Sequence, residues 1–168
     1  MRILLASVVA LLMIASEAVS CSFMPGYSPF EVNPDNFESI IINGNIASLP
    51  APKVVIDKIT RGRSDKGGAC EDAGIIDLTI TWPENSIYSI ENIGFYFQSS
   101  NGLKPNFIFP PEPVSGDIKG NKVSFFFVWL DGHPENQHNL DFSVNVFAVN
   151  KGLHIGHPTI VKIKAKKG

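Results

Sequence analysis

From residue 53 onward, hydrophobic and polar residues alternate in short runs that are separated by turn-forming residues. In the run 75–82, Ile76, Leu78 and Ile80 fall on one side, while Asp77 and Thr79 fall on the other. A period of two is typical of a β-strand with one buried side and one solvent-facing side. The pattern predicts an all-β, seven-stranded sandwich with strands at residues 54–59, 75–82, 93–98, 106–109, 123–130, 140–149 and 159–165.

The sandwich domain is expected to span residues 53–168 and to follow an N-terminal arm, residues 21–52. Proline recurs along this arm, where it fixes φ and removes a backbone donor, so continuous strand or helix is not expected. The prolines are Pro25, Pro29, Pro34, Pro50 and Pro52. Only the residues near Ile40 are expected to add a short strand.

Residues 1–20 have the pattern of a signal peptide: a positive start, an apolar run at 3–15 and small residues at 16–20. A membrane-spanning helix needs about 20 apolar residues, which is more than this run offers. We therefore expect an exported protein, periplasmic or secreted, with no transmembrane segment in its mature form.

Two cysteines, Cys21 and Cys70, remain after such cleavage. In an exported protein, an even pair indicates a disulfide first. The alternative is lipidation, because Ala18-Val19-Ser20-Cys21 partly resembles a bacterial lipobox, with Ala18 where leucine is usual. In that case the protein is a lipoprotein, anchored to the membrane through Cys21. Both alternatives stay open on the sequence.

Three runs resemble the fibronectin type III family: LTITWP at 78–83, IGFYF at 93–97 and FSVNVFAVN at 142–150. They are similar to that family's second strand with its core tryptophan, its third strand and its sixth strand. Phe142 departs from the pattern, since the family usually has tyrosine there, and no Arg-Gly-Asp occurs. The resemblance implies an immunoglobulin-like sandwich, and with it a binding or structural module of the cell envelope with no ligand named.

The net charge of −2 gives no field that attracts nucleic acid, so the expected partners are a protein or a cell-surface component. No catalytic motif occurs, and a non-catalytic protein without a cofactor is expected. A less favoured alternative is a metal-binding or hydrolytic site in the loop 131–139, at His133 and His138. The other two histidines, His154 and His157, follow the sixth predicted strand and cannot share an ion with the first two.

The run 123–130 is apolar on both sides, so Phe126 and Val128 need cover outside the core. One interpretation is that Phe30, Phe37 and the isoleucines 40–42 of the arm supply it. The other is an exposed contact surface at Phe126 and Val128, with a smaller one at Tyr96 and Phe147. Alternate lysines in the last predicted strand, from Lys162 on, favour an edge strand that is protected against unwanted pairing.

Overall fold

The structure, a computed structural model, describes residues 24–63, 70–99 and 108–168. Apart from three short 3-10 helices, its regular elements in these ranges are all strands. The strands are β1 (Ser28–Pro29), β2 (Ile41–Ile42), β3 (Asn45–Ile46), β4 (Lys53–Thr60), β5 (Ala73–Thr81), β6 (Ile93–Ser99), β7 (Val114–Ser115), β8 (Asp117–Lys119), β9 (Lys122–Leu130), β10 (Leu140–Asn150) and β11 (Thr159–Ala165). The 3-10 helices are η1 (Pro34–Asn36), η2 (Ile90–Asn92) and η3 (Pro134–Asn136).

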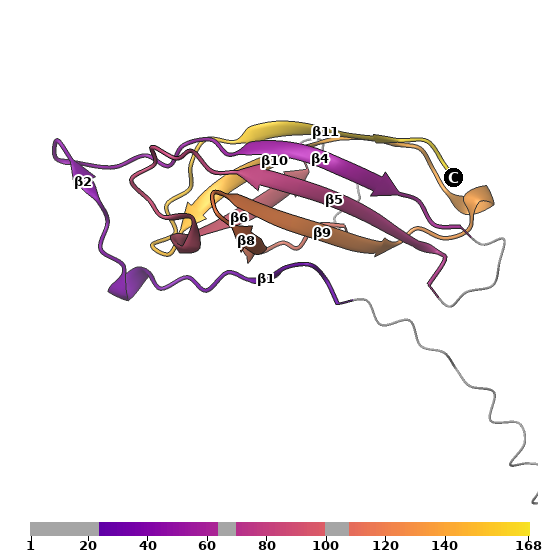
Figure 1. The fold of residues 1–168 in the computed structure, drawn as a ribbon, viewed down its shortest axis with the longest axis horizontal. Helices are drawn as coiled ribbons and strands as arrows, with labels where there is room; N and C mark the ends of the chain where they lie inside the picture. Colours follow the sequence, from indigo (N-terminus) through magenta and orange to yellow (C-terminus); the bar gives the residue numbers. More distant parts are fainter. Residues whose placement is uncertain (1–23, 64–69, 100–107) are drawn as a thin grey trace, which may run out of the picture.

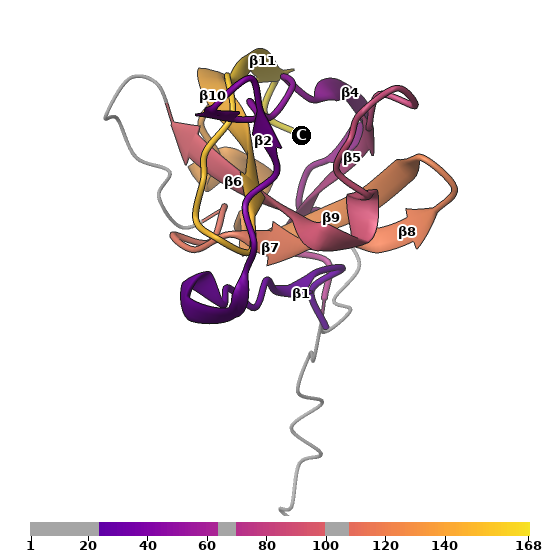
Figure 2. The same ribbon diagram turned by 90° about the vertical axis from the view of Figure 1, so that its left-hand side faces the viewer.

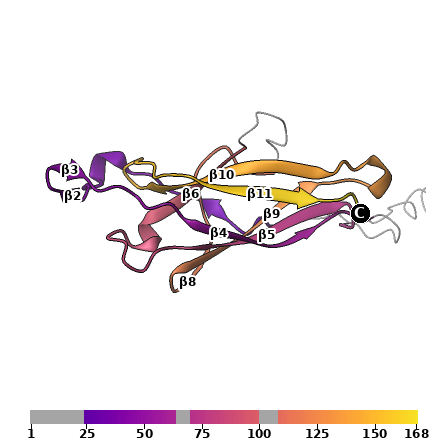
Figure 3. The ribbon, with the colours of Figure 1, turned by 90° about the horizontal axis from the view of Figure 1, so that it is seen from above.

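Two antiparallel sheets face one another across the core, as in a β-sandwich (Figures 1 and 3). One sheet has the strand order β4-β5-β9-β8, and the other has the order β1-β7-β6-β10-β11. The hairpin β2–β3 forms a separate two-stranded sheet, which projects at one end of the sandwich. The all-β sandwich predicted from the alternation is therefore present, with more strands than the seven expected.

Alternation along the long strands decides which side chains enter the core. Ile76 and Ile80 of β5 are fully buried, while Asp77 and Thr79 lie on the outer side and are partly exposed. Across the core, the rings of Phe97 and Phe127 lie 4.9 Å apart in an edge-to-face arrangement, which aromatic pairs prefer. The solvent-facing and core-facing sides of β5 are therefore those that the sequence predicts.

Strands β4, β5, β6, β9, β10 and β11 correspond to predicted segments, but the predicted strand at 106–109 was wrong in its described part. Ile108 and Phe109 lie in a turn and are buried, and residues 106–107 lie outside the described residues. The short strands β7 and β8 follow instead. The three prolines at 110, 111 and 113 lack backbone donors and delay strand pairing until Val114.

The arm is more ordered than predicted, because residues 26–30 bridge the two sheets (Figure 2). Gly26 donates its N–H to the carbonyl of Phe126 in β9 at 3.2 Å, and Ser28 and Pro29 then pair with β7. The Tyr27 ring lies 5.2 Å from that of Phe127. The arm therefore closes an open edge between the sheets, and the prolines do not prevent a strand at β1.

The arm contacts Phe126 of β9 at Gly26, but not through Phe30, Phe37 or the isoleucines 40–42, which were expected to supply the cover. Phe30 is buried, but its ring lies against Gly94 of β6, and Phe37 lies against Gly152. The isoleucines 40–42 form part of the β2–β3 hairpin and remain exposed by 36–58%. The strand expected near Ile40 is present, but its side chains do not bury Phe126.

Within the described residues, no helix has the length and apolar character needed to cross a membrane.

Candidate functional site

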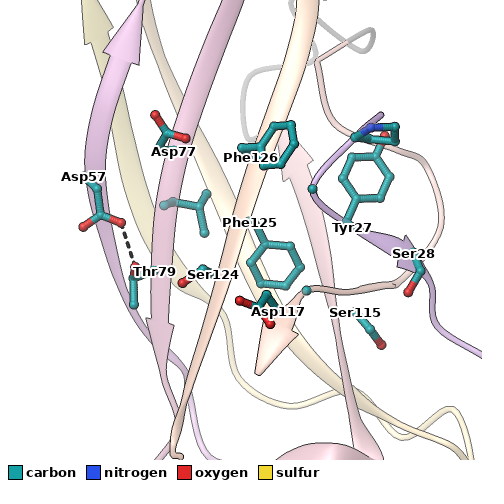
Figure 4. A pocket seen from close by; sticks show the side chains of 14 residues that line it. Tyr27, Ser28, Asp57, Asp77, Thr79, Ser115, Asp117, Ser124, Phe125 and Phe126 are labelled. Atoms are coloured by element: carbon teal, nitrogen blue, oxygen red, sulfur yellow. Dashed lines mark hydrogen bonds between the residues drawn. The ribbon is translucent and has the colours of Figure 1, made fainter. Parts of the chain in front are cut away.

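A cavity of about 460 Å³ lies between the arm and the outer side of the four-stranded sheet (Figure 4). We call it the arm groove. Residues 25–28 of the arm form one wall. Polar residues of β4, β5, β8 and β9 line the rest, together with Leu78, Phe125, Phe126 and residues 115–116. The polar members from the sheet are Asp57, Asp77, Thr79, Asp117 and Ser124.

Close contact between the arm and β9 shapes the groove. A Cβ on Gly26 would lie 1.9 Å from Cδ1 of Phe126, so only glycine lets the arm backbone approach this ring. Gly116 is equally confined, because a Cβ there would lie 2.3 Å from the carbonyl oxygen of Ser124. The two glycines allow the backbone to approach β9 from both sides of the groove.

A β-bulge brings one of the carboxylates to the groove. The pairing of β4 with β5 shifts between Ile56 and Lys58, which leaves Asp57 without a register partner. The hydroxyl of Thr79 donates to Asp57 Oδ2 at 2.7 Å, as Figure 4 shows. The bulge therefore turns a β4 carboxylate toward the polar side of β5 and holds it there.

The groove is negatively charged. Among the described residues, Asp57 and Asp77 have no ion-pair partner, and Asp117 pairs with Lys119 at 2.9 Å, where both side chains are exposed. An exposed pair of this kind gives little net stabilisation. Carboxylates accept hydrogen bonds, so this arrangement suits a ligand that brings donors or positive charge.

The residues of the two predicted contact surfaces lie on different sheets, Phe126 and Val128 on β9 and Tyr96 and Phe147 on β6 and β10. Phe126 lines the arm groove, and Val128 lines an adjoining cavity of about 380 Å³ that also contains Leu130. Tyr96 and Phe147 are register partners on the other sheet, with ring centroids 6.1 Å apart. All four predicted residues are partly buried. The cavities at Phe126 and Val128 are both lined by Pro25 and Tyr27 of the arm.

The predicted histidine loop, 131–139, is organised around Asp131 rather than around its histidines. Arg61 donates to both carboxylate oxygens of Asp131, from Nε to Oδ2 at 2.7 Å and from Nη2 to Oδ1 at 2.9 Å. Gly62 N–H and the Trp129 indole N–H donate to the same carboxylate at 2.9 and 3.1 Å. Burial raises the pKa of Asp131, but the hydrogen bonds from Arg61, Gly62 and Trp129 lower it more, so this pKa lies below its ordinary value.

The same arginine fastens the C-terminal segment to the loop. Arg61 donates to the carbonyls of His138 at 2.9 Å and Lys166 at 2.8 Å. Gln137 accepts from Gly168 N–H and donates to the carbonyl of Gly62. We call Arg61, Asp131 and these partners the polar clamp. Its hydrogen bonds hold residues 61–62, the loop 131–139 and the C-terminal segment together, which is a structural role.

The histidines do not gather into a site within the described residues. His133 and His138 are exposed in the loop before β10, while His154 and His157 lie in the loop after it. Asp131, two residues before His133, has both oxygens engaged by Arg61. In the described ranges, no group of three or more His, Cys, Asp or Glu could hold a metal ion.

Of the predicted cysteine pair, Cys21 lies outside the described residues, so both the disulfide and the lipid anchor stay predictions. Cys70 is not a free thiol. It lies just before β5, and Ala73 donates its N–H to the Cys70 carbonyl at 3.4 Å.

Sequence reasoning missed Asp57 and Arg61 as site residues. Asp77 and Thr79 carried a signal, since they mark the polar side of a predicted strand. Asp57 carried none, because its position depends on a bulge, and Arg61 meets Asp131 across 70 residues of sequence.

Comparison with known proteins does not assign the chain to a family. No protein-family model matches it, and no curated protein or solved structure matches it significantly.

Proposed function

We propose that the chain is an exported, non-catalytic binding module of the cell envelope with an immunoglobulin-like sandwich of fibronectin type III character. The strand orders β4-β5-β9-β8 and β7-β6-β10-β11 support this arrangement, as does the resemblance of residues 78–83, 93–97 and 142–150. The signal-like residues 1–20 support export. The engagement of Asp131 by Arg61 argues against the alternative of a hydrolytic site in the loop 131–139, because that carboxylate is not available as a base.

The proposed ligand is a cationic group that enters the arm groove. The supporting observation is that Asp57 and Asp77, neither of which has an ion-pair partner among the described residues, line the same cavity as the Phe126 ring. A guanidinium or ammonium can pair with a carboxylate and also lie against an aromatic face. A partner protein that presents an arginine or lysine side chain has this chemistry.

Titration with arginine amide, followed by amide chemical shifts in NMR, tests the proposal. We expect shifts at Asp77, Thr79 and Phe126 that weaken as salt is added, because partly exposed charges are screened. Asp57→Asn combined with Asp77→Asn should weaken the binding roughly tenfold, since each exposed pair contributes up to about 1 kcal/mol. The asparagine amides keep the side-chain size, so the fold should be unchanged.

Asp141→Asn is the matched control, because Asp141 is an exposed carboxylate on the other sheet, near Lys162 and Lys164. It should leave the affinity unchanged. Equal shifts with uncharged glucose, or equal weakening by the control, would reject a cation-binding groove.

A further inference from the structure

One end of the sandwich carries an exposed aliphatic surface that the arm groove does not include. It combines the β2–β3 hairpin with the loop between β10 and β11, and the hairpin projects from the sheets (Figures 1 and 3). Its side chains are about half exposed. We call this surface the aliphatic end: Ile41 (58%), Ile42 (48%), Ile46 (49%), Leu153 (50%) and Ile155 (62%).

The hairpin makes this surface protrude. Asn43 and Gly44 have φ angles of 51° and 78°, the left-handed values of a tight two-residue turn. Ile41 and Ile46 are register partners, and the hairpin pairs with no other strand of the described chain. A two-stranded sheet by itself is marginally stable in water, so packing of its apolar side chains against a partner would stabilise it.

A groove lies directly beside the hairpin. A cavity of about 520 Å³ separates β3 from the loop. Its apolar lining includes Ile46, Leu49, Leu153 and Ile155, and its polar lining is Ser48, His154 and His157. The two segments approach closely at Gly156, where a Cβ would lie 2.8 Å from Cβ of Leu49. The aliphatic end thus contains both a projecting hairpin, with exposed isoleucines on either side of its Asn43-Gly44 turn, and a largely apolar recess.

The charge distribution separates this end from the rest of the surface. Residues 39–52 and 152–158 contain no Asp, Glu, Lys or Arg. The edge strand β11, by contrast, has the exposed lysines Lys162 and Lys164, which discourage pairing with another chain. The hairpin edges have no such protection, so this end is open to association.

We propose that the aliphatic end is covered by the same surface of a second copy of this chain, with each hairpin tip in the recess of the other. Such an isologous contact needs a surface that is complementary to itself, and the adjoining tip and recess meet that requirement. Two chains of net charge −2 can approach through a surface that has no Asp, Glu, Lys or Arg without placing carboxylates opposite one another.

A lipid bilayer is the weaker occupant. The hairpin would carry unpaired backbone N–H and C=O groups into hydrocarbon, where they cannot be satisfied. A second hairpin can accept and donate those hydrogen bonds. This inference is independent of the arm groove, which lies on the outer side of the four-stranded sheet.

Sedimentation velocity of the purified protein over a range of concentrations tests the proposal. We expect a reversible dimer. Ile41→Lys in the hairpin, or Ile155→Lys at the recess, should each raise the dimer dissociation constant about tenfold or more, because the apolar side chain that the dimer would bury is replaced by a charged one. Both side chains are exposed in the single chain, so the melting curve of the dilute protein should not change.

Ile160→Lys is the control, since Ile160 is 69% exposed on β11, outside the aliphatic end. It should leave dimerisation unchanged. A mixture of the two test variants should form a heterodimer tighter than either homodimer, because one native tip then meets one native recess. A native protein that stays monomeric, a dimer that the test variants do not weaken, or monomers that float with phosphatidylcholine vesicles would overturn the proposal.

Discussion

Removal of the Asp131 carboxylate should destabilise the protein far more than removal of any exposed carboxylate. Asp131 and Arg61 pair at 2.7 Å, with side-chain exposures of 5% and 8%. In Asp131→Ala, the guanidinium stays buried while Gly62 N–H and the Trp129 indole lose their acceptor. Breaking a buried pair by removing one partner costs about 3–5 kcal/mol. Because Arg61 keeps two carbonyl acceptors, we expect the lower part of that range.

Urea unfolding at neutral pH measures this loss as a change in the free energy of unfolding. Asp141→Ala is the control, because Asp141 lies 3.5–3.6 Å from Lys162 and Lys164 and is 57% exposed. It should cost no more than about 1 kcal/mol. If Asp131→Ala and Asp141→Ala lowered the free energy of unfolding equally, the argument that burial makes the Arg61–Asp131 pair strongly stabilising would be refuted.

The contribution of Asp131 to the free energy of unfolding should also depend on pH. The pKa of Asp131 in the fold lies below its ordinary value of 3.8, so the folded state binds this proton less readily than the unfolded chain does. The stabilisation is therefore fully present above the unfolded value and is lost as the pH falls through the lower folded value. The difference between the native protein and Asp131→Asn should be constant near neutrality and shrink below about pH 4. A constant difference down to pH 2 would contradict this cause.

Two further predictions concern the arm. Gly26→Ala should displace the arm from Phe126, at a cost of about 1–3 kcal/mol, and should speed proteolytic cleavage near residues 24–30, whereas Ser28→Ala should leave both unchanged. The intact mass of the native protein should show a deficit of two hydrogens if Cys21 and Cys70 are bridged, and a gain equal to acyl groups if Cys21 is lipidated. The unmodified, fully reduced mass would contradict both alternatives for Cys21.

The long strands could be predicted from sequence because their burial alternates residue by residue. In β9, Val123, Phe125, Phe127 and Trp129 are buried while Ser124 is exposed. The alternation in the sequence therefore indicates which side of the strand faces the core. The short strands β7 and β8 could not be predicted, because proline and glycine interrupt the pattern around them and their pairing depends on neighbours distant in sequence.

The candidate site was less predictable than the core. Phe126 carried a signal as an apolar residue on the outer side of its strand, and the structure places it at the arm groove. Isoleucines 40–42 carried the same signal, but they lie in the projecting hairpin and cover nothing of β9. Hydrophobicity identifies a side chain that gains from burial, and only the fold determines whether its cover comes from the same chain.

The two ends of the sandwich differ in a way that assigns them different roles. At one end, the polar clamp satisfies Arg61 and Asp131 within the chain and fastens the C-terminal segment through Lys166. At the other, the aliphatic end holds side chains that are about half exposed, and nothing in the described residues covers them. Buried polar groups that are already paired gain nothing from a partner, whereas exposed apolar groups gain free energy by association. Association is therefore favoured at the aliphatic end, which leaves the arm groove on the side of the sandwich accessible to a ligand.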